Sequence, residues 1–313
     1  MVASVCMNPS IDRTLYLDSF ALGGTNRALK AVDHPGGKGI NTAIACRRLG
    51  LKSALYGYLY EDHRKVIMDA LEKESVQVRC DIRQGRSRLN MKILVKDRGD
   101  ITEVNEMGAH VPADEADAIA ARIIKDSPGF EMLLLTGSLP PGCPDDFYEK
   151  IAKNSAAPVI LDTTGEALRL GIRSGNIHLI KPNLSELESL VGRKLFSLRD
   201  IKQGAMECAG MGVKYVVVSM GKKGAVMTDG KDCFHCPAIP VKVGSTVGAG
   251  DCMVAGITYS LTRMDDDLKT TLKRAVAAGT AGTVTEGTDL LYMDDFNFFF
   301  NEIKNTKITD MRD

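Results

Sequence analysis

The sequence predicts an α/β fold with a mainly parallel sheet, helices on both of its faces, and a small antiparallel sheet attached to it. Short runs of β-branched and aliphatic residues alternate with helix-like segments, several of which end in glycine, as helices often do. The runs that predict strands are 2–7, 131–137, 157–162, 177–182 and 214–220. Because strands that alternate with helices form parallel sheets, we expect ligands to bind beyond the carboxyl ends of these strands.

Two regions interrupt this alternation and predict the small antiparallel sheet. Residues 12–35 and 86–108 show partial alternation of apolar and polar side chains, with turns at Gly23-Gly24 and at Arg98-Gly99-Asp100. Each region is therefore expected to form a two-stranded ribbon, and the two ribbons could serve as a lid or as a dimer surface. The chain has no internal repeat and no linker, so we predict a single domain, 1–313, with this sheet as an excursion.

The composition gives no sign of a strongly charged surface. Lys plus Arg and Asp plus Glu are both 40 among 313 residues, so the formal net charge is zero. We therefore expect neither a nucleic-acid nor a membrane partner, and an anionic ligand must be held by a local cluster of cations. The first ten residues lack a basic targeting region, and no segment approaches 18 uninterrupted apolar residues. These features predict a cytoplasmic protein.

The eight cysteines are too sparse for a disulfide framework and are expected to be reduced core residues. Cys233 and Cys236, in "CFHC", lack the second ligand pair that a structural zinc site needs, and they lie in a predicted strand and loop. The five histidines fall at no ligand-like spacing. The sequence therefore predicts no metal site built from cysteine or histidine.

The stretch "GSTVGAGDCMVAG" is a glycine turn that leads into a predicted helix. It does not match the dinucleotide-binding fingerprint, because Met253 stands where the third glycine is required, and the chain contains no P-loop sequence. The N–H groups of Gly248, Ala249 and Gly250, with the helix dipole, could stabilise charge that develops during a reaction. Asp251 could then accept a proton from an attacking hydroxyl, or it could only stabilise the start of the helix.

A second glycine-rich turn, "HPGGKGIN", precedes another predicted helix. Glycines such as Gly37 let a polyol approach the backbone, Lys38 supplies a charge for a phosphate, and Asn41 offers an amide donor and acceptor. Asp12, in "NPSIDRT", follows the first strand and could accept sugar hydroxyls. A glycine-rich turn with a single lysine is more often an ordinary loop, and Asp12 fits equally well as a turn residue.

Three further segments follow predicted strands. In "KPNLSELESLVG", Asn183 and Glu186 fit a capping box, which this segment taken alone favours, or a network near magnesium-bound phosphate. "TGSLPPG" presents Ser138 at the carboxyl end of a strand, and "SMGKKGA" offers backbone donors to phosphate in the corresponding position.

Together these segments resemble the PfkB (ribokinase-like) family of carbohydrate kinases, and the resemblance covers essentially the whole chain. "PGGKGINTA" is similar to the family's amino-terminal signature, "KPNLSELE" to its N-x-x-E region, and "STVGAGDCMVAG" to its carboxyl-terminal signature. Three ordered motifs at the expected separations are highly specific. The resemblance implies a ribokinase-like three-layer α/β/α sandwich with a small antiparallel β lid formed by about 12–35 and 86–108.

The resemblance also implies ATP-dependent phosphorylation of a sugar-phosphate hydroxyl, with Mg²⁺, and a lid that doubles as a homodimer interface. Asp251 is implied as the catalytic base, and Gly248, Ala249 and Gly250 as the anion hole. The residues implied to bind the sugar phosphate are Asp12, Gly37, Lys38, Asn41, Arg88, Ser138 and, from the partner's lid, Arg27. Those implied near ATP are Lys181, Asn183, Ser219, Gly221 and Gly224, with Glu186 in the magnesium–phosphate network.

Within the family, "NPSIDRT" and "TGSLPPG" resemble the hexose-phosphate branch. "SRLNMKI", "GGTNR" and Lys38 are most similar to the 1-phosphofructokinase pattern, which predicts that fructose 1-phosphate is converted to fructose 1,6-bisphosphate. "AVAAGTAGTVTEGTDLL" is equally similar to the 6-phosphofructokinase branch, and tagatose-6-phosphate kinase shares the scaffold. The sugar therefore stays open at this point, as does any requirement for a monovalent cation.

Two alternatives come from other classes of protein. A dehydrogenase fits the sheet but lacks the dinucleotide fingerprint. An inactive sugar-phosphate sensor fits the fold, but a sensor could lose Asp251 freely, and here the base and the anion hole are both present. The sequence departs from the family pattern in "YGYLYEDHRKV", which keeps only Gly57, and in "EMGAH", so the resemblance does not extend to the shape of the substrate-side loop.

Overall fold

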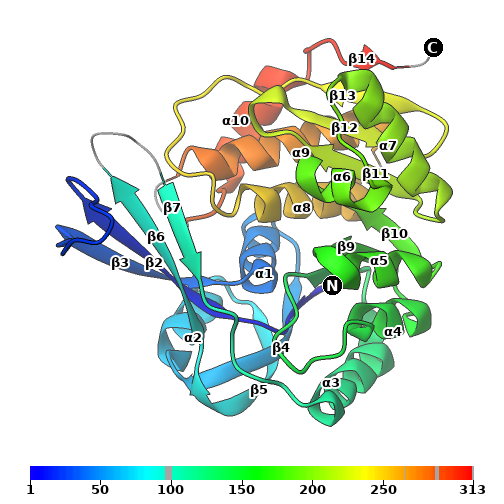
Figure 1. Ribbon diagram of the computed structural model, residues 1–313. Helices are drawn as coiled ribbons and strands as arrows, with labels where there is room; N and C mark the ends of the chain where they lie inside the picture. The colour runs from blue at the N-terminus through cyan, green and yellow to red at the C-terminus, as the bar shows by residue number, and fades with distance from the viewer. Residues whose placement is uncertain (96–100, 265, 286–288, 312–313) are drawn as a thin grey trace.

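In the computed structural model of the protein, the described residues form a ten-stranded sheet and a four-stranded sheet (Figure 1). The structure describes residues 1–95, 101–264, 266–285 and 289–311. The α/β prediction is confirmed. The smaller sheet stands beside the body of the molecule, as the two ribbon-like regions predicted.

The large sheet has the order β14-β13-β12-β11-β10-β9-β8-β1-β4-β5. Neighbours from β5 through β11 run parallel, and β12, β13 and β14 continue the sheet antiparallel. The five predicted strands are β1 (Val2–Cys6), β8 (Met132–Thr136), β9 (Val159–Asp162), β10 (Ile177–Ile180) and β11 (Tyr215–Ser219). The others are β4 (Ser53–Asp62), β5 (Gln77–Arg86), β12 (Ala225–Thr228), β13 (Cys233–Cys236) and β14 (Thr309–Asp310).

Helices cover both faces of this sheet, so the molecule has three layers (Figure 1). One face is covered by α1 (Lys38–Arg48), α2 (Arg64–Lys73), α8 (Ala249–Tyr259), α9 (Leu268–Thr283) and α10 (Met293–Ile303). The other is covered by α3 (Ala113–Asp126), α4 (Phe147–Asn154), α5 (Gly165–Arg173), α6 (Leu184–Val191) and α7 (Leu198–Gly210). Single turns are η1 (Ser127–Gly129) and η2 (Gly221–Lys223), and a π-helical turn, η3 (Ser260–Met264), extends α8.

The two faces carry separate hydrophobic cores. Successive side chains of a strand point to opposite faces, and in β1 Val2 and Cys6 belong to one core while Ala3 and Val5 belong to the other. A strand buried on both faces reads as a continuous apolar run, which is why these strands could be recognised in the sequence.

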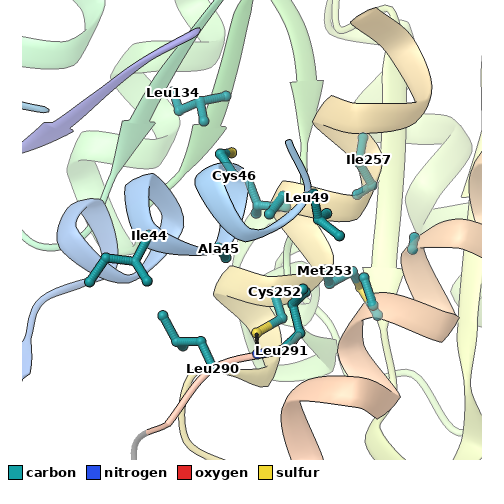
Figure 2. Packing of buried hydrophobic residues seen from close by; sticks show 14 of the residues in the cluster. Ile44, Ala45, Cys46, Leu49, Leu134, Cys252, Met253, Ile257, Leu290 and Leu291 are labelled. Carbon is teal, nitrogen blue, oxygen red and sulfur yellow. Dashed lines mark hydrogen bonds between the residues drawn. The ribbon is translucent and has the colours of Figure 1, made fainter. Parts of the chain in front are cut away.

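The first core joins α1 to α8, the two helices that begin with the glycine-rich turns. Ile44, Cys46 and Leu49 of α1 lie in the same cluster as Cys252 and Ile257 of α8 (Figure 2). Each of these side chains is at most 5% exposed, so the relative position of the two helices is fixed by close packing.

The smaller sheet, here called the lid, has the order β3-β2-β6-β7. Its strands are β2 (Ser10–Leu17), β3 (Lys30–Gly36), β6 (Arg88–Val95) and β7 (Ile101–Asn105). Each predicted ribbon is antiparallel, and the two ribbons join through a parallel pairing of β2 with β6. Gly23-Gly24 lies in the loop between β2 and β3, whereas the turn predicted at residues 98–100 lies outside the described residues.

The segment "YGYLYED", where the sequence departs from the family pattern, forms the end of β4. Gly57 has φ 128°, and a Cβ at this position would lie 2.0 Å from the carbonyl oxygen of Cys6. The glycine therefore lets β4 pass close to the end of β1. The strand continues to Asp62 and pairs with β5.

The cysteines lie mainly in the core, as expected, and "CFHC" forms a strand. All eight lie within the described residues as free thiols, most of them buried, and Cys233 and Cys236 form the two ends of β13. No helix of the described part of the chain combines the length and the apolar composition needed to cross a membrane.

Candidate active site

The glycine turn before α8 has the backbone geometry of an anion site. Gly248 is the N-cap residue with φ 78°, and a Cβ there would lie 2.6 Å from Cδ2 of Leu290. A Cβ on Gly250 would lie 3.4 Å from Nζ of Lys181, so the first turn of α8 adjoins a buried ammonium group. N–H groups in the first turn of a helix have no partner within the helix, and the dipole is positive there. The turn and Lys181 can therefore hold a negatively charged group.

Asp251 lies in this first turn and is buried, with 5% of its surface exposed. Its Oδ2 accepts a 2.8 Å hydrogen bond from Nδ2 of Asn41, in the first turn of α1. Burial raises the pKa of Asp251 to about 6 and the charge of Asp162 acts in the same direction, while Lys38, the Asn41 hydrogen bond and Lys181 oppose the rise. A carboxylate with a pKa near neutrality is well suited to accept a proton.

Asp162, at the carboxyl end of β9, connects the two lysines of the site. Lys38 Nζ lies 3.0 Å from Asp162 Oδ1, and Lys181 Nζ lies 3.6 Å from the same oxygen. Burial would raise the pKa of Asp162, but the charges of Lys181 and Lys38 outweigh it and hold the pKa below its usual range. The pKa of Lys38 is raised, because Asp162 and Asp251 outweigh its burial. Asp162 is therefore ionised beside a carboxyl group whose pKa is raised.

A pocket of about 150 Å³ lies between the lid and the carboxyl ends of the strands. Lys38 and Arg88 supply its positive charges, and Ser138 supplies a hydroxyl. Asn8 Nδ2 donates to the carbonyl of Met107 at 3.0 Å and to Ser138 Oγ at 3.4 Å. The pocket is lined by Cys6, Asn8, Lys38, Arg88, Thr136, Gly137, Ser138 and Thr164. Its size and charge suit a small phosphorylated molecule.

The "EMGAH" segment packs against Asn8, which lines this pocket. Gly108 has φ 101°, and a Cβ there would lie 2.2 Å from Oδ1 of Asn8. The glycine lets the chain that returns from the lid pass directly over Asn8, which explains its presence although the neighbouring residues depart from the family pattern.

Two larger pockets follow the first, and each shares a lining residue with the one before it. One, of about 360 Å³, shares Thr164 with it and is also lined by Asn183 and Glu186. The next, of about 350 Å³, shares Asn183 and is lined by Ser219 and Gly221. Asn183 forms a β-bridge with Ser219, so the two segments are directly joined. The row of neighbouring pockets is therefore lined by three of the predicted ATP residues, Asn183, Ser219 and Gly221, whereas Lys181 and Gly224 line none of the three pockets.

The capping box predicted at the start of α6 is confirmed. Asn183 Oδ1 accepts from the N–H of Glu186 at 2.9 Å, and Glu186 Oε2 accepts from the N–H of Asn183 at 2.8 Å. Gly224 has φ 87°, and a Cβ there would lie 2.0 Å from the carbonyl oxygen of Cys236, so η2 must be followed by glycine.

Comparison with known proteins identifies the arrangement. Residues 5–292 match the family described as "pfkB family carbohydrate kinase". The chain belongs to this family. It is 33% identical over 301 residues to ATP-dependent 6-phosphofructokinase isozyme 2 of Escherichia coli (94% of this chain, 96% of that one). It is 34% identical over 284 residues to the 1-phosphofructokinase of the same organism (88% of each chain).

A solved structure supports the same conclusion for this pfkB family kinase. Phosphofructokinase-2 from E. coli in complex with substrates and products aligns with a TM-score of 0.91 at 31% identity, over 97% of this chain and 99% of that one. Other structures of that enzyme are described as a complex with potassium and as a tetrameric inhibited form. The protein is therefore an ATP-dependent sugar-phosphate kinase of the ribokinase-like fold.

The structure brings most of the predicted site residues of this kinase together, but not Arg27. Arg27 is exposed in the loop between β2 and β3 and lines none of the three pockets. A role that depends on a partner's lid stays a prediction.

Three polar residues were missed in the sequence: Asp162, Asn90 and Lys92. Asp162 could have been found, because it is the last residue of a predicted strand and parallel sheets place ligands at that end. Asn90 and Lys92 both contact Asp12, with Lys92 Nζ 2.6 Å from Asp12 Oδ2. Both alternate with apolar residues in β6, but the pattern alone does not show which face of the lid is turned toward the pocket.

Proposed function

We propose that this kinase transfers the terminal phosphoryl group of ATP to a hydroxyl of fructose 1-phosphate, which gives fructose 1,6-bisphosphate. The observation that carries the proposal is the position of Asp251, whose pKa is raised to about 6, in the turn that forms the anion site. A proton acceptor beside a site for transient negative charge is what phosphoryl transfer to a hydroxyl requires.

The sugar phosphate would occupy the 150 Å³ pocket. Arg88 and Lys38 are its cations, and Ser138 adds a hydrogen-bonding hydroxyl. Asn41 holds Asp251 from the substrate side, so the accepting hydroxyl would approach between α1 and α8. Gly37 has φ 106°, and a Cβ there would lie 3.0 Å from Cys6 Sγ, so this position does not accept a side chain. The absence of a side chain at the start of α1 leaves the backbone open to the sugar.

ATP would lie along the row of pockets that contains Asn183, Ser219 and Gly221. Lys181 would meet the transferred group, since its Nζ adjoins Gly250. The ATP residues are supported by the shared lining of neighbouring pockets rather than by any single contact.

The residues present fit Mg²⁺ that enters with ATP. Asp162 Oδ2 is buried and has no hydrogen-bond partner within the described ranges, and Glu186 lines the adjoining pocket. Among the described residues no group of three or more His, Cys, Asp or Glu side chains could hold a metal. Mg²⁺ in kinases is commonly bound by one or two carboxylates and the substrate phosphates. When bound, it would neutralise charge on the phosphates.

The preference for fructose 1-phosphate rests on the sequence pattern in "SRLNMKI" and "GGTNR" and on relatives named 1-phosphofructokinase. Fructose 6-phosphate is the second candidate, because the match to 6-phosphofructokinase isozyme 2 extends over more of this chain.

The decisive experiment mixes the purified protein, ATP and Mg²⁺ with fructose 1-phosphate, fructose 6-phosphate or tagatose 6-phosphate and follows ADP release. Turnover with none of the three would overturn the proposed function. A higher kcat/KM with fructose 6-phosphate than with fructose 1-phosphate would assign the 6-phosphofructokinase reaction instead. Repeating the assay with Na⁺ in place of K⁺ tests whether a monovalent cation is required.

We further propose that the lid forms a homodimer interface. Leu22 and Leu29 in the β2–β3 loop are 96% and 65% exposed, and Val104 on β7 is 48% exposed. Apolar surface of this kind is usual where two chains meet. Light scattering on the purified protein, compared with a Leu22→Asp variant, tests this; a monomeric wild-type protein would overturn it.

A further inference from the structure

The lid has one polar face that continues from the substrate pocket. Arg88 lines the pocket, and Asn90 and Lys92 follow it at alternate positions of β6. Alternate residues of a strand share a face, so these three side chains lie on the pocket side of the lid. In β2, Asp12 is paired with Asn90 and Thr14 with Lys92, which places them on the same face.

Asp12 is held in this face by three donors. Ser10 Oγ and Asn90 Nδ2 both donate to Asp12 Oδ1 at 2.9 Å, and Lys92 Nζ donates to Oδ2 at 2.6 Å. The side chains of Asp12 and Lys92 are each only 6% exposed. A Cβ on Gly36 would lie 2.3 Å from Asp12 Oδ1, so the backbone of β3 covers that oxygen. Oδ2 is therefore the oxygen that keeps capacity to accept a further hydrogen bond.

Asn90 connects this carboxylate to the phosphate end of the pocket. Its Oδ1 accepts from Arg88 NH1 at 3.1 Å, while its Nδ2 donates to Asp12. The cation that would bind a phosphate and the carboxylate that would bind a hydroxyl are thus set at a fixed separation by one amide side chain. A ligand with a phosphate and a hydroxyl group fits this arrangement.

Two buried polar atoms beside the ion pair point to a ligand as well. Thr14 Oγ1, next to Lys92, and His34 Nδ1, on the residue paired with Asp12, have no hydrogen-bond partner in the part of the chain that the structure describes. Buried polar groups are almost always paired in folded proteins, so each unpaired group needs an explanation. A polyol bound against this face would offer hydroxyls to both atoms.

Stability alone does not account for the Asp12–Lys92 pair. Taking two charges out of water costs about as much as their attraction returns, and apolar residues of similar volume often replace such pairs without loss. The pair does, however, keep Asp12 charged and fixed, which makes it an acceptor for hydroxyl donors and a poor neighbour for a second phosphate.

We propose that Lys92 is a positioning residue, which holds Asp12 as the acceptor for one hydroxyl of the sugar phosphate and thereby helps to determine which sugar binds. This inference rests on the proposed function, since it assumes that a sugar phosphate occupies the pocket.

The test compares the wild-type protein with Lys92→Met, Asp12→Asn and the double variant. For Lys92→Met we expect the KM for the sugar phosphate to rise about 10- to 100-fold, as for loss of a hydrogen bond to a charged group, with the KM for ATP unchanged. Lys65→Met is the matched control, because Lys65 is 85% exposed and paired only on the surface of α2. It should leave both KM values unchanged.

The double variant separates positioning from direct contact. If Lys92 acts through Asp12, the double variant and Asp12→Asn bind the sugar phosphate with the same Kd, measured by calorimetry. A further loss of tenfold or more in the double variant would mean that Lys92 contacts the sugar itself, which overturns the proposal. This comparison also decides the question if Lys92→Met alone does not fold. The double variant leaves no unpaired buried charge, and in Asp12→Asn the side-chain oxygen can still accept from Lys92.

Different results would overturn the proposed function and the proposed role of Lys92. Absence of wild-type turnover on every hexose phosphate overturns the proposed function. Wild-type turnover together with a sugar-phosphate KM for Lys92→Met within about twofold of the wild-type value overturns only the role of Lys92.

Discussion

Asn41 Nδ2 donates a 2.8 Å hydrogen bond to Asp251 Oδ2, which joins the first turns of α1 and α8 although the two residues are 210 positions apart. The amide supplies a donor to Oδ2, so Oδ1 is the oxygen left to receive a proton from a substrate. One contact therefore fixes both the position and the orientation of the proposed base.

Asp251→Asn should remove most of the activity while ATP still binds. The amide has nearly the same shape and can still accept from Asn41, but it cannot take up the proton of the attacking hydroxyl. General-base help is worth about 10²–10⁴-fold, so kcat should fall within that range. ATP affinity, measured by calorimetry, should change little. Near-normal turnover by this variant would place the base elsewhere.

The kcat of the wild-type protein should rise with pH through about 6 and level off above it, because the pKa of Asp251 lies there and only the ionised carboxylate accepts a proton. A pH series from 5 to 9 under saturating substrates measures this. The residual activity of Asp251→Asn should lack the rise. A wild-type profile that is flat between pH 5 and 7 would contradict the assignment.

The same raised pKa predicts how stability depends on pH. The pKa of Asp251 is about 6 in the folded protein and near 3.8 in the unfolded chain, so the folded state binds the proton more tightly. This difference adds to the free energy of unfolding below the lower pKa, and the added stability is lost as the pH rises through about 6. The side chain of the Asp251→Asn variant stays neutral, so burial of a charge does not destabilise this variant at high pH. The free energy of unfolding of the variant should therefore exceed that of the wild type at pH 7.5, and the difference should shrink toward pH 4 in urea titrations.

Arg88→Ala should chiefly weaken binding of the sugar phosphate. Arg88 lines the pocket and donates to the carbonyl oxygens of Asn8 and Glu106, so its guanidinium is held in place before a ligand arrives. Loss of a charge-assisted contact should raise the KM for the sugar phosphate about 10- to 100-fold. The KM for ATP is the internal control. An unchanged sugar-phosphate KM would reject the phosphate role.

Gly248→Ala and Gly250→Ala should differ in their effect on stability. Gly248 has φ 78°, and the added Cβ would also contact Leu290, so its replacement should lower the free energy of unfolding by at least about 1–2 kcal/mol. At Gly250 the added Cβ would lie 3.4 Å from Lys181 Nζ, an ordinary contact distance. That variant should remain stable and lose activity, because the added methyl group takes up space beside Lys181 where the transferred group would lie. Chemical denaturation of both variants, with activity assays, distinguishes the two effects.

The buried strands could be predicted because parallel strands covered on both faces are short, continuous apolar runs between turns. The two lid ribbons could be predicted from alternation and turns. Their joining could not, because β2 and β6 are distant in sequence and their parallel pairing leaves no local pattern. The strand that contains "YGYLYED" was not among the predicted strands, because this segment was compared with a substrate-side loop of the family.

The parts of the candidate site that contain glycine-rich turns could be predicted from the sequence. A Cβ would strain or crowd the backbone at three glycines, Gly37, Gly57 and Gly248. Glycine is therefore required at these positions, and the requirement is visible in the local sequence. Asp162 and Lys92 form ion pairs with Lys38 and Asp12, which are far away in the sequence. These pairs can be recognised only in the folded structure, where the sheet and the lid bring the partners together.

The position of β1 between β8 and β4 has a consequence for how the site is assembled. The residues that line the 150 Å³ pocket come from segments between Cys6 and Thr164, whereas the anion turn and Asp251 lie at the start of α8. The contact between α1 and α8 can therefore form only when segments far apart in the chain have packed on the same face of the sheet. The sugar side and the phosphoryl side of the proposed site are thus joined by the fold and not by the chain.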